Sequence, residues 1–264
     1  IKWLLFDFEA DLTPSKPNHH SLEYGRDVER TRIAEPIRIV ETAEEILVDS
    51  GVLKIAVSKL HGSVIEAAWL DADRDGIYEP SERVIRPKSG QGAYFVTQTG
   101  EQFRSTAKDA DYSAVVETAG PQRTVIRTRG WYQNEKGERA CYFIHRLYVY
   151  RGRPEVRLFT TWVITVDTDR MWFRDIGLRL PLQLKRRQTA TLGPDIRFQK
   201  MPVRISPLDR PVFALQAGRN QGSVTIKPDG EQAGTWRVGG WVDLSDSAGG
   251  LTVAVFDMEK QSPT

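Results

Sequence analysis

The chain has 264 residues, of which 40% are hydrophobic and 27% are charged, a composition that excludes a disordered polymer, a collagen-like repeat and a protein embedded in a bilayer. Its 37 Lys and Arg residues nearly balance its 35 Asp and Glu residues, so overall charge favours neither nucleic acid nor a membrane as a partner. No apolar run approaches about 18 residues. The single cysteine, Cys141, cannot form an intrachain disulfide or, alone, a thiolate zinc site.

The N-terminal segment Ile1–Ala10 is apolar and rich in aromatic residues, which predicts a buried strand rather than a basic leader. Because a domain ordinarily begins and ends in exposed polar sequence, we expect the chain to be cut out of something longer. The alternative is a small protein whose first strand is central to its sheet. The charged segment Arg26–Pro36, which ends in proline, is interpreted as a linker.

Short runs of alternating or continuous apolar residues recur along the rest of the chain, separated by Gly, Pro, Asp and Asn, and this pattern predicts an all-β fold of antiparallel strands. Helical periodicity is nearly absent, and only Thr42–Ile46 is expected to form one helical turn. The clearest expected strands are Val52–Ser58, Ser63–Leu70, Thr124–Tyr132, Arg139–Tyr150, Glu155–Val166, Trp172–Pro181, Ser223–Lys227, Thr235–Asp243 and Leu251–Phe256.

Two turn signals organise the middle of the chain. Asn134–Gly137 separates two strong strand patterns and offers a glycine for a positive φ, and Arg151–Pro154 plays the same part before the next strand. We therefore expect four consecutive strands over Thr124–Pro181 to form a meander. Long strands of this kind favour a large antiparallel β-sandwich.

One motif is sharp. The segment Asp71–Glu82, DADRDGIYEPSE, matches the D-x-D-x-D-G-x5-E calcium loop at every position. The spacing offers carboxylates from Asp71, Asp73 and Asp75, the carbonyl of Ile77 and a bidentate carboxylate from Glu82, and these hard oxygens suit calcium.

The loop lies between strands, so it is not an EF-hand domain, and its expected role is to hold the loop rather than to catalyse. Its Gly76 permits a sharp turn. The alternative is a solvated acidic turn, with Arg74 and Arg83 neutralising part of its charge.

The histidines give weaker signals. His19 and His20 lie in a polar loop and are expected to be exposed, while His61 precedes a glycine in a tight turn. His145 lies on an otherwise apolar strand face, which is more typical of a hydrogen-bonded core histidine than of a catalytic base. No nucleophile elbow or phosphate-binding glycine loop is present.

Arginines recur on the strands of the expected meander. Guanidinium groups gathered on one sheet face would suit carboxylates, and the alternative is a solvated face where they pair with Glu155, Asp175 or Asp169. The arginines are Arg127, Arg129, Arg146, Arg157, Arg174 and Arg179. Three tryptophans, Trp131, Trp162 and Trp172, can stack on a sugar, but aromatic residues of large strands are core residues by default.

Four segments, IKWLLFDFEADLTPSKPNHHSLEYG, WLDADRDGIYEPSERVI, FRDIGLRLPL and GWVDLSDSAGGLTVAV, resemble the exo-rhamnogalacturonan lyase family of polysaccharide lyases, in the same order along most of the chain. The resemblance implies a RIFT-type β-barrel domain, a central β-sandwich and a following α/α toroid domain. By that comparison residues 1–36 hold the end of the barrel-like domain with its linker and residues 37–264 hold the sandwich. The pattern departs near Phe256–Lys260, and the toroid domain is missing.

The family's activity implies removal of a unit from the end of rhamnogalacturonan, an acidic pectic polysaccharide, by β-elimination. That chemistry needs a base, a cationic or hydrogen-bonding group at the substrate carboxylate, and an acid. Arginines such as Arg146, Arg157 and Arg174 suit the role of the cationic group at the substrate carboxylate. No motif in these segments identifies the catalytic residues. The implied partners are an acidic glycan and the C-terminal α/α toroid of the full-length protein, and an extracellular or periplasmic location is favoured.

Two other functions remain open from the sequence. One is a noncatalytic carbohydrate-binding module, and the other is a structural calcium-stabilised β-protein of a cell-surface assembly. A measurement of lyase activity distinguishes a polysaccharide lyase from both of these functions.

Overall fold

The computed structural model divides the chain into two compact units, one made of Ile1–Glu66 and Ser89–Arg179 and the other of Ala67–Lys88 and Leu180–Thr264. Its regular structure is almost entirely antiparallel β-strand, which confirms the expected all-β class. In the described part no helix has the length and hydropathy needed to cross a bilayer. The structure describes residues 8, 10, 17, 19–29, 33–185, 187–194, 202–208, 211–218, 221–226, 230–234 and 238–256.

The first unit begins with three antiparallel strands, β1 (Arg38–Glu41), β2 (Glu45–Asp49) and β3 (Leu53–Ser58). Along β2 every second residue, Ile46 and Val48, is fully buried, as expected for a strand with one face on the core. On β3 the core residues are Leu53, Ile55 and Val57, with Ala56.

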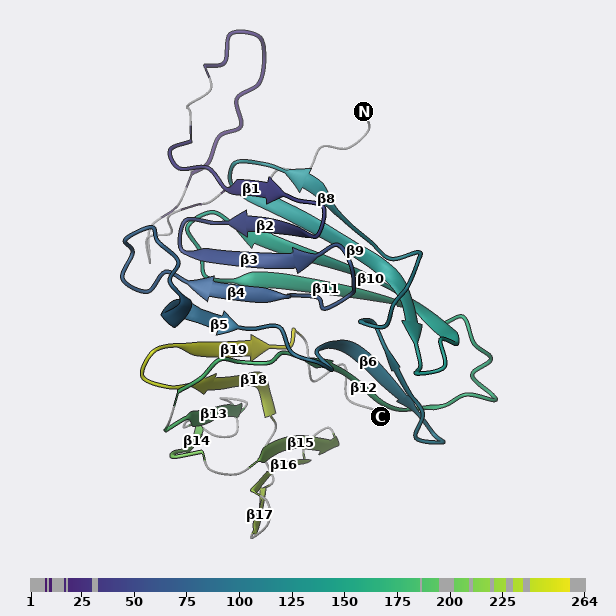
Figure 1. Ribbon diagram of the computed structural model, residues 1–264. Helices are drawn as coiled ribbons and strands as arrows, with labels where there is room; N and C mark the ends of the chain where they lie inside the picture. Colours follow the sequence, from purple (N-terminus) through teal and green to yellow (C-terminus); the bar gives the residue numbers. More distant parts are fainter. Residues whose placement is uncertain are drawn as a thin grey trace. The chain divides into compact units, whose positions relative to one another are not determined.

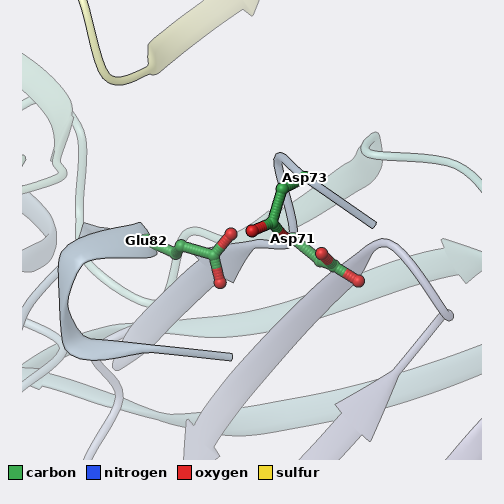
Figure 2. Close-up of side chains that lie close together, drawn as sticks. All are labelled: Asp71, Asp73 and Glu82. Atoms are coloured by element: carbon green, nitrogen blue, oxygen red, sulfur yellow. The ribbon is translucent and has the colours of Figure 1, made fainter. Parts of the chain in front are cut away.

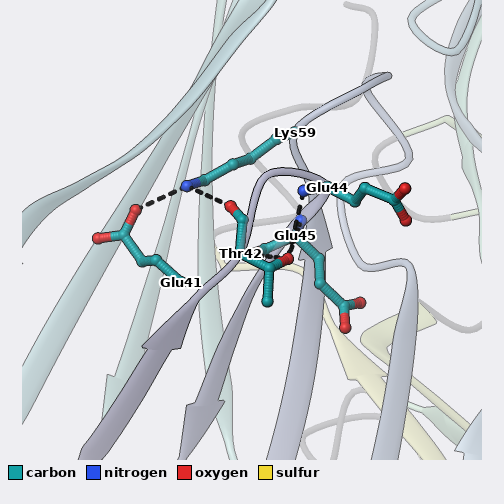
Figure 3. A network of polar contacts seen from close by, with 5 residues as sticks. All are labelled: Glu41, Thr42, Glu44, Glu45 and Lys59. Atoms are coloured by element: carbon teal, nitrogen blue, oxygen red, sulfur yellow. Dashed lines mark hydrogen bonds and ion pairs between the residues drawn. The ribbon is translucent and has the colours of Figure 1, made fainter.

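The expected helical turn at Thr42–Ile46 is wrong, because this segment is the turn between β1 and β2 followed by the start of β2. The hydroxyl of Thr42 accepts the backbone N–H groups of Glu44 and Glu45, at 3.2 and 3.1 Å. Lys59 donates to the Thr42 carbonyl and to Glu41, at 2.9 and 2.8 Å (Figure 3). Threonine hydroxyls stabilise such turns at the expense of helix.

The second sheet of this unit has the order β11-β10-β9-β7-β6-β12, and β8 also pairs with β9. In Figure 1, β1, β2 and β3 lie in front of β9, β10 and β11, and the Tyr112 hydroxyl donates to the Ser58 carbonyl at 2.8 Å. The two sheets therefore form a β-sandwich. The strands are β6 (Gly92–Thr97), β7 (Gln102–Arg104), β8 (Ser113–Ala119), β9 (Arg123–Gln133), β10 (Arg139–Tyr150), β11 (Val156–Val163) and β12 (Phe173–Arg179).

Both expected hairpins of the meander are confirmed. In the first, Gly137 has φ +80° and the Asn134 side chain accepts the backbone N–H groups of Lys136 and Glu138. In the second, Gly152 has φ +66°. The order β9-β10-β11 therefore follows the chain, because short turns join neighbouring antiparallel strands.

The fourth strand of the expected meander does not pair as the sequence predicts. The strand β12 pairs with β6, with Ile176 opposite Phe95, and makes no ladder with β11. The loop after β11 carries the chain to the other end of the strand order, and Phe173 at the start of β12 packs against the rings of Phe95 on β6 and Trp162 on β11, 5.3 and 4.8 Å away.

The second unit contains the pair β4 (Ala67–Leu70) and β5 (Arg83–Ile85), with a 3-10 helix η1 (Pro80–Glu82) before β5. Two small sheets follow, of order β14-β13-β18-β19 and β15-β16-β17. Their strands are β13 (Thr189–Pro194), β14 (Val203–Ile205), β15 (Val212–Gly218), β16 (Gln221–Ile226), β17 (Gly230–Gly234), β18 (Val238–Ser245) and β19 (Gly250–Ala254).

Most of the expected strands are present, with ends shifted by a few residues. The expected strand Ser63–Leu70 is too long, because regular structure begins only at Ala67 and Val64 has φ +71°, which lies outside the extended region of regular strands. The expected strand Ile1–Ala10 and the family departure near Phe256–Lys260 lie mostly outside the described residues. The domain division at residue 37 stays a prediction.

Candidate functional site

The segment with calcium-loop spacing connects β4 to η1 in the second unit. Oxygen atoms of Asp71, Asp73 and Glu82 all lie within 4.8 Å of one another. Figure 2 shows Glu82 reaching toward Asp73 from the far end of the loop, with Asp71 beside Asp73. Three of the predicted ligands are thus brought together across eleven positions of sequence.

Backbone N–H groups hold the first carboxylate in place. Asp71, only 4% exposed, accepts the N–H of Asp75 at 3.2 Å and the N–H of Gly76 at 3.0 Å. The chain reverses because Arg74 and Gly76 have φ +63° and +80°, which glycine adopts without steric cost and arginine does not.

The last carboxylate is held by the short helix. Glu82 accepts the N–H of Ala72 at 2.9 Å with one oxygen and the N–H of Glu79 at 3.1 Å with the other, in a capping box at η1. Pro80 starts this helix, where its missing N–H costs nothing. The proline thus favours the turn that returns Glu82 to the start of the loop.

One of the predicted carboxylate ligands, Asp75, is arranged differently, whereas the ligand role of the Ile77 carbonyl stays a prediction. Asp75 is not a member of the carboxylate group in the described residues, and its side chain accepts the N–H of Ile77 at 2.7 Å. The Ile77 side chain is exposed. The carboxylate of Asp75 therefore helps to shape the turn that contains the Ile77 peptide group.

The electrostatics of the loop favour a cation. The N–H of Asp75 lowers the pKa of Asp73, but desolvation and the negative charges of Asp75 and Glu82 raise it more, so the pKa of Asp73 lies above its ordinary value. Within the described residues no ion pair joins Arg74 or Arg83 to these carboxylates, and the Arg83 guanidinium lies over the Trp69 ring at 4.7 Å. An all-oxygen donor set of this kind fits calcium.

The four histidines do not form a site. His145 is 1% exposed, lies 3.2 Å from the Thr160 hydroxyl and stacks on Phe143, which confirms the core interpretation. Burial lowers the pKa of His145 to about 4. His61 lies 3.7 Å from Glu66. The remaining two, His19 and His20, are exposed, as expected.

The arginines of β9 and β10 share one face of the sheet. Arg127 and Arg146 lie directly opposite each other in the strand register, an arrangement that is unfavourable between like charges. Glu117 on β8 relieves it, because it accepts from Arg127 at 3.1 Å and from Arg146 at 2.6 and 3.1 Å. The sequence reasoning missed Glu117, since β8 was not recognised as a strand.

Arg157 on β11 pairs with Glu155 at 3.4 Å. This pair is one of those expected if the arginines lie on a solvated face with acidic partners. Arg129 donates to the Ser113 hydroxyl at 3.1 Å. The structure thus combines both sequence alternatives: the arginines share a face, and acidic or polar side chains partner them.

Two predicted arginines lie elsewhere. Arg174 and Arg179 belong to β12, which pairs with β6 and not with β10 or β11, so the expectation that Arg174 lies on a strand neighbouring those of Arg146 and Arg157 is wrong. The Arg179 guanidinium lies 4.3 Å from the Tyr94 ring centre, and the Tyr94 hydroxyl donates to Asp175. Register across a sheet cannot be read from the chain alone.

The three tryptophans have different environments. Trp162 packs among Phe95, Tyr132 and Phe173 inside the sandwich. Trp131 is half-buried and contacts Tyr142 edge to face at 5.2 Å. Trp172, at 66% exposure, lies just before β12. Trp162, which is half-buried and surrounded by the rings of Phe95, Tyr132 and Phe173, comes nearest to the default expectation of a core residue.

Comparison with models of protein families matches residues 37–198 to the family described as PcRGLX-like protein central beta sandwich domain. The match covers more than half of the chain. It includes every strand of the sandwich described above and the whole acidic loop. A comparison with curated proteins gave no match.

Proposed function

Because the chain belongs to the family of the PcRGLX-like central β-sandwich domain, we propose that it is the sandwich module of a polysaccharide lyase that acts on the acidic pectic glycan rhamnogalacturonan by β-elimination. In this proposal the module binds glycan carboxylates, and an α/α toroid domain of the full-length protein completes the cleft. The observation that carries the binding role is the outer face of β9, β10 and β11.

The outer face is the side of these strands that points away from β1, β2 and β3. Since side chains alternate along a strand, every second residue lies on it. Phe159 is 59% exposed there, beside Tyr148. The outer face consists of Arg127, Arg129, Trp131, Tyr142, Ile144, Arg146, Tyr148, Arg157, Phe159 and Thr161.

This combination of groups suits an acidic sugar chain. Guanidinium forks bind carboxylates through two parallel hydrogen bonds, and exposed rings offer flat apolar surface beside them. The strand register places Arg146 between Arg127 and Phe159. Cationic and aromatic groups therefore lie next to each other on this face.

The reaction requires more than carboxylate binding. A base must remove the proton at C5, and an acid must protonate the departing oxygen. His145 is buried in the core and cannot contact a substrate. The arginines supply the positive charge that stabilises the substrate carboxylate as charge moves into it.

The proposal includes one structural calcium ion held by Asp71, Asp73, Asp75, the Ile77 carbonyl and Glu82. Its support is the gathering of three carboxylates and the raised pKa of Asp73. The ion would neutralise these charges and fix the connection between β4 and β5. This observation also favours the second candidate function, a calcium-stabilised module that binds carbohydrate without cleaving it.

Glycan binding is tested by titrating the chain with rhamnogalacturonan oligosaccharides. The double variant Arg129→Gln with Arg146→Gln is expected to weaken binding by roughly three- to tenfold, because each exposed ion pair contributes at most about 1 kcal/mol. Arg174→Gln is the matched control, since Arg174 is also an exposed strand arginine but lies on β12. Equal affinities of the double variant and the unmodified chain, with both folded, would contradict the proposal.

A further inference from the structure

The four-stranded sheet β14-β13-β18-β19 of the second unit has one polar face (Figure 1). Along β13, Ala190 and Leu192 are buried, whereas Thr191 between them is half-buried. Because side chains alternate along a strand, Thr191 and the residues paired with it lie on the opposite face from the two buried residues. This polar face consists of Thr189, Thr191, Gly193, Arg204, Trp241, Asp243, Ser245, Gly250, Thr252 and Ala254.

The indole ring of Trp241 lies against the strand beside it. The two cross-strand neighbours of Trp241 are the small residues Gly193 and Ala254. A Cβ atom at Gly193 would overlap the indole ring, so the ring occupies the space directly above the glycine. Trp241 is only half-buried, and it therefore still offers aromatic surface to a partner. A ring of this kind can pack against the C–H groups of a sugar.

A row of polar side chains crosses the four strands next to this ring. Its members lie directly opposite one another in the strand register, and they are Arg204, Thr191, Asp243 and Thr252. The carboxylate of Asp243 accepts the hydroxyl proton of Ser245 at 2.7 Å and that of Thr252 at 2.8 Å. These hydrogen bonds hold the three side chains in one arrangement before any ligand binds, which reduces the entropic cost of binding.

The hydrogen bonds also indicate which ligand the row suits. A hydroxyl that donates its only proton keeps its lone pairs as acceptors, so Ser245 and Thr252 can accept from a ligand. At the other end of the row, the exposed Arg204 supplies donors. Sugar hydroxyls donate and accept at the same time, so they match both ends. A ligand carboxylate next to Asp243 would be repelled by its negative charge.

We propose that the polar face of this sheet is a binding site for a neutral sugar. The sugar ring packs on Trp241, and its hydroxyls donate to Asp243 and Thr252. Except for its three β13 residues, the site lies beyond residue 198, where the family match ends, and it shares no strand with the outer face of β9, β10 and β11. The site stands on its own geometry, and only the choice of rhamnose as the neutral sugar rests on the proposed function.

The test follows the indole and backbone N–H signals of the full chain by NMR during titration with methyl rhamnoside, galacturonate and cyclohexanol. The indole signal of Trp241 is identified by its absence in Trp241→Phe. We expect methyl rhamnoside to move this signal and to bind at least roughly threefold more tightly than galacturonate or cyclohexanol.

Two variants measure the parts of the site. Trp241→Ala removes the ring and should weaken rhamnoside binding roughly fivefold. Thr252→Val removes one hydroxyl at nearly constant shape and should weaken it roughly threefold. Trp172→Ala is the matched control, since Trp172 is an exposed tryptophan just before β12, and it should leave rhamnoside binding unchanged.

An unmoved Trp241 signal would overturn the proposal, and so would unchanged rhamnoside affinity in a folded Trp241→Ala chain. Galacturonate or cyclohexanol that binds as tightly as methyl rhamnoside would overturn the assignment to a neutral sugar. If Trp241→Ala fails to fold, Thr252→Val decides, because Thr252 is exposed.

Failure of this site and failure of the proposed function give different results. Rhamnoside binding at Trp241, in a chain whose affinity for rhamnogalacturonan oligosaccharides does not depend on Arg129 and Arg146, would support the site and refute the outer face. Oligosaccharide binding that does depend on these arginines, without any rhamnoside binding at Trp241, would support the outer face and refute the site.

Discussion

His145 illustrates how one buried residue couples the sandwich to pH. It lies opposite Thr128 and Thr160 on the inner face of β10, and its Nε2 atom has no hydrogen-bond partner among the described residues. Desolvation disfavours the charged imidazole, which lowers the pKa of His145 from 6.5 to about 4. The folded protein therefore binds a proton less readily than the unfolded chain.

This difference predicts a loss of stability in acid. As pH falls from about 6.5 toward 4, the unfolded chain takes up a proton first, and the free energy of unfolding should fall by an amount on the order of 3 kcal/mol. His145→Gln should remove most of this pH dependence, measured by urea denaturation at pH 7 and pH 4.5. His61→Gln is the control, and an equal pH dependence in His145→Gln and the unmodified chain would contradict the assignment.

Glu117 is a second residue whose charge matters. The hydrogen bond from Arg146, together with the charges of Arg146 and Arg127, lowers the pKa of Glu117, although desolvation opposes it. A lowered folded-state pKa stabilises the protein above the unfolded pKa, and that stabilisation is lost as pH falls through the folded value.

Glu117→Gln should therefore destabilise the sandwich at neutral pH by at most about 1 kcal/mol, since the pair is partly exposed. The difference from the unmodified chain should shrink in acid, because the stabilisation is lost as Glu117 becomes protonated. Thermal melts at pH 7 and pH 3 measure it. Glu155→Gln, which removes a carboxylate with a single, longer arginine contact, should have a smaller effect, and a larger effect of Glu155→Gln would refute the role of Glu117 as the bridge between two arginines.

Among the structural elements, the loop between β4 and η1 makes the clearest prediction. Calcium that binds the folded state but not the unfolded chain raises stability by about 2.7 kcal/mol at a hundredfold excess over the dissociation constant. Millimolar calcium added to chelator-treated protein should raise its melting temperature. Magnesium, which demands a tighter octahedral site, should raise it less.

Asp71→Asn should abolish the rise in melting temperature, because Asp71 is the most buried of the three gathered carboxylates. Asp49→Asn is the control, since Asp49 also accepts a backbone N–H in a turn, from Gly51, outside the loop. No change in melting temperature at millimolar calcium, together with no heat in a calorimetric titration, would refute the metal site.

At the scale of the whole molecule, the arrangement of charged and buried groups predicts binding without efficient cleavage. The arginines that suit a substrate carboxylate lie on the outer face, whereas His145 is buried. The chain alone should therefore cause little rise in ultraviolet absorbance on rhamnogalacturonan, where elimination creates a conjugated double bond. Robust turnover would contradict this prediction and assign the catalytic groups to the sandwich, and His61→Gln would then be the first variant to measure.

The sequence by itself determined the features that depend on neighbouring residues. Alternating apolar residues predicted β9, β10 and β11, and Gly137 predicted the hairpin turn, because pleat and turn are local properties. The spacing of Asp71, Asp73 and Glu82 predicted their gathering, since one loop carries all three. The use of Asp75 to shape the turn was not predictable, because spacing does not say which carboxylates the backbone will engage.

Only the tertiary structure decided which distant segments meet. Pairing of β12 with β6 separated Arg174 from Arg146, and the unrecognised strand β8 brought Glu117 between two arginines. The cavity lined by Gln122 and Arg153 likewise lies between two turns about thirty positions apart in the chain. The reason is that strand order and register depend on which faces bury the most apolar surface together, a property of the whole fold that no single segment carries.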